Sequence, residues 1–421
     1  MNSSTHSHSN ASNKNNNWIW PLFACAVGAG ILYLPINAGL FGIWPFIVLL
    51  VLTFPVVYLC HWYLTRFVLT ASKGTTNIND IVYENFSERF SQVFAICYFF
   101  SIFPLTLIYT VGLTNTINSV LINNFSIEIP RFILAFVILF SILVVVVTKP
   151  VFIRKVTKFL ALPLAAFLFS LSVYLIPKWH MDHFQIFPNI TDLLTTLFFT
   201  LPVIIFAINY MPIISTFALS HAEHPNPEKA TSNTLWRASL LIFAFSMFFV
   251  FSCIMCLSPD NMAVAKQTNT NILVYMGNYF NDPILKVVNP MIAIIAMTGA
   301  CFSSFFGVKE SVIGLIEQKL HRHKLASKRL DHIAIALILI PCYIVCVCDT
   351  SILGLMSKLS GPIIALLLFV FPVYAVYKMP KLYKYNKTMQ DKLGNYYVLI
   401  VGLISCSAIL YSFKDFLYYF L

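Results

Sequence analysis

The feature that most constrains this chain is a series of long apolar blocks separated by short polar stretches. A helix of about 20 apolar residues crosses the roughly 30 Å hydrocarbon layer of a bilayer, because each residue advances about 1.5 Å. Backbone polar groups inside a bilayer must be satisfied within the protein, so only helices and closed barrels cross it. Barrel strands alternate apolar and polar residues, and runs such as 133–147 do not alternate. The sequence therefore predicts an all-α integral membrane protein.

Charged residues are too few to cover the surface of a soluble protein. Only 10% of the 421 residues are charged, whereas roughly 25% is usual in a soluble domain. Counting the apolar blocks predicts eleven transmembrane helices. They begin near Trp18, Ile43, Phe90, Phe132, Phe159, Leu193, Leu235, Ile284, Ile333, Ile352 and Tyr396.

The N-terminal segment 1–17 is rich in Ser, Asn and His, and we expect it to be disordered and cytoplasmic. It has no basic region leading into a short apolar stretch, so we do not expect a cleaved signal peptide. The remaining range, 18–421, forms a single predicted transmembrane domain.

The formal net charge of +11 could suggest a nucleic-acid partner, but the positions of the charges indicate a membrane protein instead. If the N-terminus is internal, 21 of the 27 Lys and Arg residues lie in internal segments and 5 in external ones. Positive residues concentrate on the cytoplasmic side of membrane proteins. We therefore predict an internal N-terminus and an external C-terminus, with basic loops facing anionic lipid headgroups and no nucleic-acid partner.

Two of the predicted spans are interrupted near their midpoints. The first carries Gly28 and Gly30, followed by Pro35, and the sixth carries Asn209 and Pro212. Glycine relaxes the helical preference of the backbone, and proline removes a backbone donor. Glycine and proline are also common in membrane helices for packing reasons alone, so each interruption by itself is a weak signal.

The positions of the two interruptions indicate an internal repeat. Spans one and six are five apart, so two halves of five helices would enter the membrane from opposite sides. Breaks at corresponding places in two halves are the best sequence indication of a transporter binding site. The predicted fold is a five-plus-five inverted repeat, with a first repeat at 18–176, a second at 193–377 and one extra helix at 396–421.

The broken helices would present charged ends at mid-membrane. The second half of span one would begin near Gly30 with free N–H groups, which suit a carboxylate. The first half of span six would end between Phe206 and Asn209 with free carbonyls, which suit an ammonium or a metal cation. A site with both ends fits a zwitterionic amino acid, although this geometry permits that substrate without selecting it.

Five stretches carry a family pattern: AVGAGILYLPINAG at 26–39, YFFSIFPL at 98–105 with Tyr109 and TNT at 114–116, NYMPIIS at 209–215, SFFG at 304–307, and LSGPII with FPVYA at 359–375. In this order they resemble the hydroxy/aromatic amino acid permease family of the amino acid–polyamine–organocation superfamily. The likeness is closer to its serine/threonine branch than to its tryptophan/tyrosine branch, and it covers nearly the whole chain after the first 17 residues.

The resemblance implies secondary import of serine or threonine coupled to a cation, usually a proton, and we place this import at a bacterial-type inner membrane. We expect no cofactor. Applied to the broken helices, it predicts a substrate site formed by the backbone of Gly28, Ala29 and Gly30, the Tyr109 hydroxyl, the Phe206 carbonyl, and the side chains of Asn209 and Ser215. Hydroxyls on span eight of related transporters join carbonyls of span one around sodium. The candidate residues for coupling transport to a cation are Ala26, Ser303, Ser304 and Lys358.

The chain departs from the family at two positions. Many members carry a basic residue where this chain has Asn37 and a lysine where it has Ser303. Lys358 could take part of the role of that lysine, or its side chain could extend to the membrane surface. The two serines could equally serve helix packing. His61 is expected near the inner membrane interface rather than in a proton pathway.

Other functions remain open at this level. The substrate could be an aromatic or another neutral amino acid, and the coupling ion could be a proton or sodium. A membrane-embedded enzyme would need a polar catalytic cluster, and the chain has no HExxH or GxSxG motif. A passive channel is expected to form a symmetric assembly, which a single-chain repeat does not favour. We therefore predict a transporter rather than an enzyme, with no dedicated metal site and an undetermined oligomeric state.

Overall fold

A computed structural model describes residues 18–420 except 73–74, 76, 147–149, 186, 281 and 320–327. The N-terminal segment expected to be disordered, 1–17, lies outside the described residues. The regular elements of the described part are all helices. The chain therefore has the all-helical architecture that its apolar blocks predict.

Eight described helices are long and apolar enough to cross a membrane, and a bent pair makes a ninth if it counts as one span. The bent pair consists of α2 (Ile19–Ala26) and α3 (Ala29–Ala38). The other spans contain α4 (Ile43–Val68), α6 (Glu88–Phe125), α8 (Pro150–Leu175), α9 (Ile190–Ala207) with α10 (Ile214–Leu219), α11 (Pro227–Cys256), α14 (Pro283–Lys319), α15 (Lys328–Val347) and the segment from α16 (Ile352–Leu355) to α18 (Phe371–Lys378).

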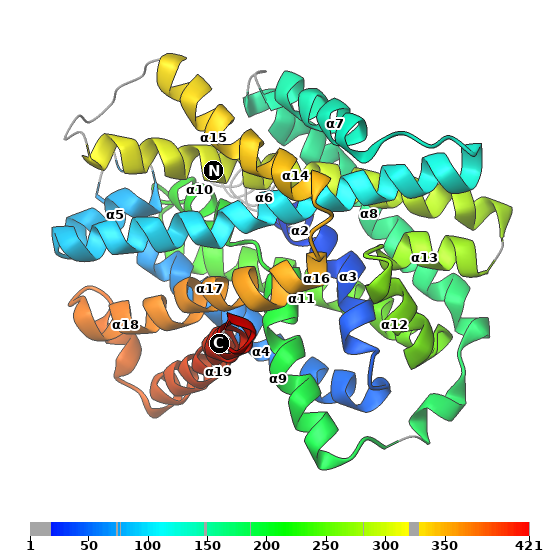
Figure 1. The fold of residues 1–421 in the computed structure, drawn as a ribbon. Coiled ribbons are helices and arrows are strands. Elements are labelled where there is room, and N and C mark those ends of the chain that lie inside the picture. Colours follow the sequence, from blue (N-terminus) through cyan, green and yellow to red (C-terminus); the bar gives the residue numbers. More distant parts are fainter. Residues whose placement is uncertain are drawn as a thin grey trace, which may run out of the picture.

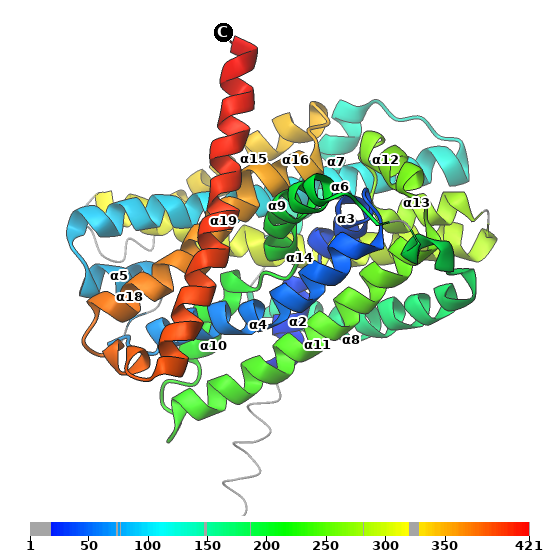
Figure 2. The same cartoon turned by 90° about the horizontal axis from the view of Figure 1, so that it is seen from below.

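Two further helices, α7 and α19, are not among these nine candidate spans, so the predicted number of eleven stays a prediction. The helix α7 (Arg131–Val146) is apolar but has only 16 residues. The helix α19 (Met389–Phe420) projects from the bundle at its C-terminal end, as Figure 2 shows.

The bundle surrounds the bent pair. The helices α6 and α14 lie side by side (Figure 1), and both contact the residues around the bend. The α2–α3 pair lies near the middle of the bundle, next to α9 and α11 (Figure 2). Its residues from Leu22 to Leu34 are buried, because neighbouring helices cover them on all sides. The bend is therefore inside the protein and not exposed to lipid.

Several helices begin before the apolar block that predicts them. Ser87, Asn189 and Asn226 each accept a hydrogen bond from the backbone N–H three residues later, at the starts of α6, α9 and α11. Such side chains satisfy amides that a helix start leaves free. The capped first turns extend the helices beyond their apolar blocks, so a count of apolar residues places their starts too late.

The structure also contains short helices that the sequence analysis did not predict. These are α5 (Ile78–Asn85), α12 (Pro259–Gln267) and α13 (Ile272–Tyr279). Each is capped by an Asn or Ser side chain, but none is long enough to produce an apolar block. The tenth span is irregular as well, since π-helical turns at η4 (Met356–Ser360) and η5 (Leu366–Val370) separate α16, α17 (Gly361–Ala365) and α18.

A polar cluster links several helices at the end of the bundle that is predicted to be external. One Arg131 nitrogen donates to Asp349 at 2.8 Å and to the Asn115 side-chain oxygen at 2.6 Å. Asn269, between α12 and α13, also donates to Asp349 at 3.0 Å. The backbone of Asn269 and of Asp349 is left-handed, with φ of 51° and 48°. The Tyr33 hydroxyl of α3 donates to the Asn269 carbonyl at 3.4 Å, so the cluster reaches the broken span.

Replacing Arg131 by alanine is expected to lower the midpoint of thermal unfolding in detergent by about 2–4 °C. The substitution removes the donor to the buried Asn115 oxygen and leaves that atom without its charged partner. Arg89→Ala is the matched control, because Arg89 is exposed at the start of α6. Equal midpoints for the two variants would mean that the cluster does not stabilise the fold.

Candidate functional site

The first span is broken between α2 and α3, which are bent by 51° relative to each other. Val27 and Gly28 separate the two helices, and Gly28 has φ of −137° and ψ of −146°. No side chain caps the start of α3. The first amides of a helix have no acceptor within the helix, and together they carry a partial positive charge. The start of α3 is therefore a donor-rich point, at almost the position predicted from Gly28 and Gly30.

The sixth span is broken between α9 and α10. The helix α9 ends at Ala207, residues 208–210 are not helical, and a 3-10 turn, η3 (Met211–Ile213), leads into α10. The Asn209 amide donates to the Phe206 carbonyl at a long 3.4 Å. The last carbonyls of α9 thus have few partners and carry a partial negative charge. This break also lies within the predicted segment.

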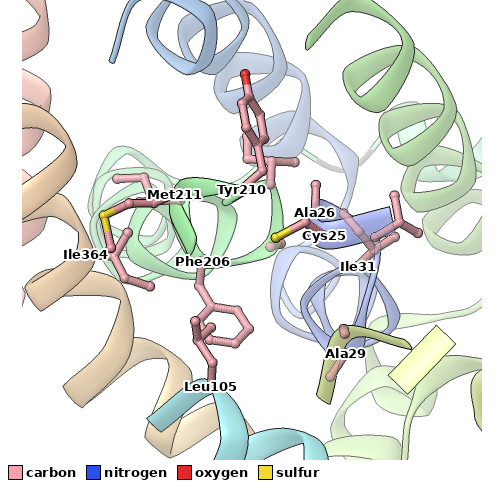
Figure 3. Close-up of a cluster of buried hydrophobic side chains, with 14 of the residues drawn as sticks. Cys25, Ala26, Ala29, Ile31, Leu105, Phe206, Tyr210, Met211 and Ile364 are labelled. Carbon is pink, nitrogen blue, oxygen red and sulfur yellow. The ribbon is translucent and has the colours of Figure 1, made fainter. Parts of the chain in front are cut away.

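The two breaks lie against each other. A Cβ atom added at Gly30 would be 2.4 Å from the Ala207 Cα atom and 3.1 Å from the Phe206 ring. Such an approach is possible only because Gly30 has no side chain. Figure 3 shows Phe206 pointing toward Leu105 of α6, with Ala29 to the right of the ring. The donor end of α3 and the acceptor end of α9 therefore meet in the protein interior.

Asn37 joins the same two helices further along. Its side-chain nitrogen donates to the Thr200 hydroxyl at 3.3 Å, which links α3 to α9. The family resemblance identified Asn37 only as a departure from a basic residue. In this chain the position holds the two broken spans together with a neutral hydrogen bond.

Tyr109 of α6 reaches the first break. A Cβ atom added at Gly28 would be 3.1 Å from the Tyr109 hydroxyl and 2.6 Å from the Ala300 Cβ atom of α14. Tyr109 is buried, and no hydrogen bond joins its hydroxyl to another described residue. The structure thus places a polar hydroxyl next to the unwound backbone of Gly28.

Asn209 contributes a second polar group, in the other break. Its side-chain oxygen accepts from the Met211 amide at 2.9 Å. Its side-chain nitrogen is buried and has no hydrogen-bond partner among the described residues. Leaving a buried donor unpaired costs about 1–3 kcal/mol, which an oxygen atom of a ligand would offset.

The remaining predicted site residues lie elsewhere or bind other partners. Ser215 is half-buried in α10, beyond the break. Ser303 donates to the Gly299 carbonyl at 3.1 Å, and Ser304 donates to the Cys301 carbonyl at 3.0 Å and contacts Thr106 at 3.2 Å. Lys358 is exposed in η4.

Ala26 is the one coupling candidate at a break, because it ends α2 and its carbonyl accepts from the Gly28 amide at 3.1 Å. The described contacts do not bring Ser215, Ser303, Ser304 or Lys358 to that point. The described residues also contain no group of three or more His, Cys, Asp or Glu side chains able to hold a metal ion.

His61, which is expected near the inner membrane interface, is enclosed by the protein and does not lie at its surface. Only 1% of His61 is exposed, and its ring stacks on Tyr210 with centroids 3.6 Å apart. The Tyr210 amide donates to its Nε2 atom at 3.3 Å. The ring is therefore in contact with the break in span six. A histidine inside an apolar block is itself a signal of function, and it was missed because the end of that block was placed too close to the residue.

A cavity lies at the end of the bundle that is predicted to be external. Its volume is ≈ 590 Å³, and its lining includes Leu40 just after α3, Lys266 of α12, and Asn269 and Asp349 of the polar cluster. The lining carries a charge of each sign. The cavity therefore lies just beyond the C-terminal end of α3. The donor-rich break lies at the N-terminal end of the same helix.

The sequence profile of the tryptophan/tyrosine permease family matches residues 21–412. Among similar proteins, the serine transporter SdaC of Escherichia coli (strain K12) is 35% identical over 406 residues, which cover 94% of each chain. The threonine/serine transporter TdcC of Yersinia enterocolitica is 34% identical over 422 residues, covering 94% of this chain and 95% of TdcC.

Solved transporters share the fold at much lower sequence identity. A manganese transporter of Eremococcus coleocola superposes with a TM-score of 0.63 at 13% identity, covering 98% of this chain and 90% of that one. MhsT in complex with L-phenylalanine superposes with a TM-score of 0.62 at 14% identity, covering 94% and 97%. These similarities concern the arrangement of the helices.

Proposed function

Because the chain belongs to the tryptophan/tyrosine permease family, we propose that it imports a small hydroxyl amino acid, serine or threonine, by cation symport. It is a multi-pass membrane protein and not an enzyme. Transport proceeds by alternating access around the two helix breaks. The relatives that are named as serine and threonine/serine transporters support this choice of substrate.

The observation that carries the proposal is the meeting of two oppositely charged helix ends at Gly30 and Ala207. The free amides at the start of α3 bind the carboxylate of the substrate, and the free carbonyls at the end of α9 bind its ammonium group. The two groups of an amino acid lie on one carbon atom, so the two sites must be adjacent. The hydroxyl of Tyr109 and the side-chain nitrogen of Asn209 bind the remaining polar atoms.

The proposed topology has eleven transmembrane helices in a five-plus-five inverted repeat, with α19 as the extra helix. The N-terminus is internal, the C-terminus is external, and the membrane is a bacterial-type inner membrane. The excess of Lys and Arg in the internal segments supports this orientation. The occurrence of breaks in spans one and six supports the repeat, because inverted-repeat transporters place their sites at such paired breaks.

Labelling of the native cysteines tests the orientation. Cys348, next to the polar cluster, is exposed, whereas the other nine cysteines are buried or half-buried. A membrane-impermeant maleimide added to intact cells is expected to label the wild type at one position, and Cys348→Ser is expected to abolish the label. Labelling that occurs only in inside-out vesicles, and again depends on Cys348, would reverse the proposed orientation.

Uptake by purified protein in liposomes tests the function. Labelled serine should accumulate when a proton gradient or a sodium gradient is imposed, and the gradient that drives accumulation identifies the coupling ion. Unlabelled threonine should compete, and tryptophan and tyrosine should not. Competition by tryptophan or tyrosine alone would favour an aromatic substrate, the second candidate that the family name supports. No accumulation of any neutral amino acid under either gradient would contradict the proposal.

A further inference from the structure

His61 is a buried polar side chain that the transport scheme above does not use. It lies in the C-terminal half of α4, between Cys60 and Trp62, and it is almost fully enclosed. Polar groups in the interior of a membrane protein are costly, so each one needs a reason to be there. The surroundings of the ring supply that reason.

The hydrogen bonds of the ring determine its tautomer. The Nδ1 atom lies 2.8 Å from the Val57 carbonyl oxygen, one helical turn earlier. A carbonyl only accepts hydrogen bonds, so Nδ1 carries the proton and Nε2 carries a lone pair. The Nε2 atom lies 3.3 Å from the Tyr210 backbone nitrogen. His61 is therefore a neutral acceptor aimed at the backbone of span six.

The Nε2 atom of His61 replaces a backbone acceptor that the Tyr210 amide loses at the break. In a continuous helix the Tyr210 amide would donate to the Phe206 carbonyl, four residues earlier. In this protein the amide donates to His61, and the Phe206 carbonyl accepts from the Asn209 amide at a long 3.4 Å and from the Ile208 amide. A buried amide without an acceptor would favour closing the helix. The imidazole removes that tendency, and it leaves the Phe206 carbonyl without the Tyr210 amide as its helical partner.

Two further contacts hold Tyr210 in place. Its ring lies nearly parallel to the His61 ring, with an angle of 12° between them. Its hydroxyl is 2.6 Å from the Ser239 hydroxyl of α11. The backbone, the ring and the hydroxyl of Tyr210 are thus bound by two different helices. The unwound segment is therefore anchored to α4 and to α11.

We infer that His61 is a positioning residue of the transport site, which holds the Tyr210 amide and so keeps span six unwound next to the substrate. This inference rests on the proposed function, because the Phe206 carbonyl that it releases is a proposed substrate ligand. His61 itself acts through the backbone and does not contact the substrate.

Hydrogen–deuterium exchange tests the anchor without any substrate. Peptides covering 204–214 should exchange faster in His61→Leu than in the wild type, because the Tyr210 amide loses its acceptor. His61→Gln places an amide oxygen at a similar reach and should restore much of the protection. Equal exchange in the wild type and in His61→Leu would overturn the inference.

Transport kinetics test the consequence for the site. His61→Leu is expected to raise the KM for serine about tenfold or more, whereas His61→Gln should stay within about threefold of the wild type. Thr234→Ala is the matched control: it removes another buried hydroxyl of α11, one that donates to the Ala230 carbonyl of its own helix, and it should leave the KM unchanged. A His61→Leu variant that yields less folded protein with an unchanged KM has lost only stability, and that result would also overturn the inference.

The two readouts separate this inference from the proposed function. Faster exchange in His61→Leu, combined with a wild type that transports no neutral amino acid, would defeat the proposed function and leave the anchor standing. Serine transport by the wild type, with exchange and KM both unaffected by His61→Leu, would defeat the anchor alone.

Discussion

Replacing Gly30 by alanine is expected to lower serine uptake about 100-fold, because the new methyl group forces α3 away from α9. The added Cβ atom would lie 2.4 Å from the Ala207 Cα atom, so it meets backbone rather than a movable side chain. The donor end of α3 and the acceptor end of α9 would then no longer match one amino acid. Initial rates of labelled serine uptake in proteoliposomes, at equal amounts of folded protein, measure the effect.

Two controls make this test specific. Gly314→Ala, in α14, introduces the same methyl group where the nearest atom is 3.8 Å away, and it should transport like the wild type. Ala207→Gly removes the side chain at the contact but keeps the backbone, so it should not rescue Gly30→Ala. A Gly30→Ala variant with wild-type uptake would show that the close approach of the two helices is not needed for transport.

Replacing Gly28 by alanine is expected to raise the KM for serine about tenfold, and this defect should be reversible by a second substitution. The added Cβ atom would lie 2.6 Å from the Ala300 Cβ atom, so the main collision is between two side chains. Ala300→Gly removes that collision and leaves only the contacts of 3.1 Å with Tyr109. The double variant should therefore recover most of the affinity.

The comparison of the four proteins in this cycle gives the coupling between the two positions. Wild type, Gly28→Ala, Ala300→Gly and the double variant are measured for KM and for maximal uptake rate. A double variant that is as impaired as the sum of the single changes would indicate that Gly28 serves the flexibility of the backbone rather than space beside α14. That outcome would contradict the packing described around the first break.

The places of the two breaks could be predicted from the sequence because they depend on local chemistry. Gly28 and Gly30 weaken the helix of the first span, and Asn209 and Pro212 separate two helices of the sixth span. These effects act within a few residues. Gly30 was recognised as a breaker, but its contact with Ala207 could not be foreseen. That contact joins segments distant in sequence, and periodicity within either span carries no information about it.

The features that were missed depend on tertiary packing. His61 was assigned to the membrane interface because the boundary of its span was uncertain, while the structure encloses it between α4 and the second break. The π-helical turns η4 and η5 change the hydrogen-bond register inside an apolar block, and composition does not report register. Among the described contacts, the serines proposed for coupling bind carbonyls of their own helix. The pairing of Ser303 and Ser304 with Ala26 therefore stays a prediction.

A structure determined with bound serine tests the central claim most directly. We expect the carboxylate of serine within hydrogen-bonding distance of the amides at the start of α3, with its ammonium group facing the last carbonyls of α9. Serine bound elsewhere in the protein, with the backbone at Gly28 and at residues 208–210 closed into continuous helix, would contradict the account.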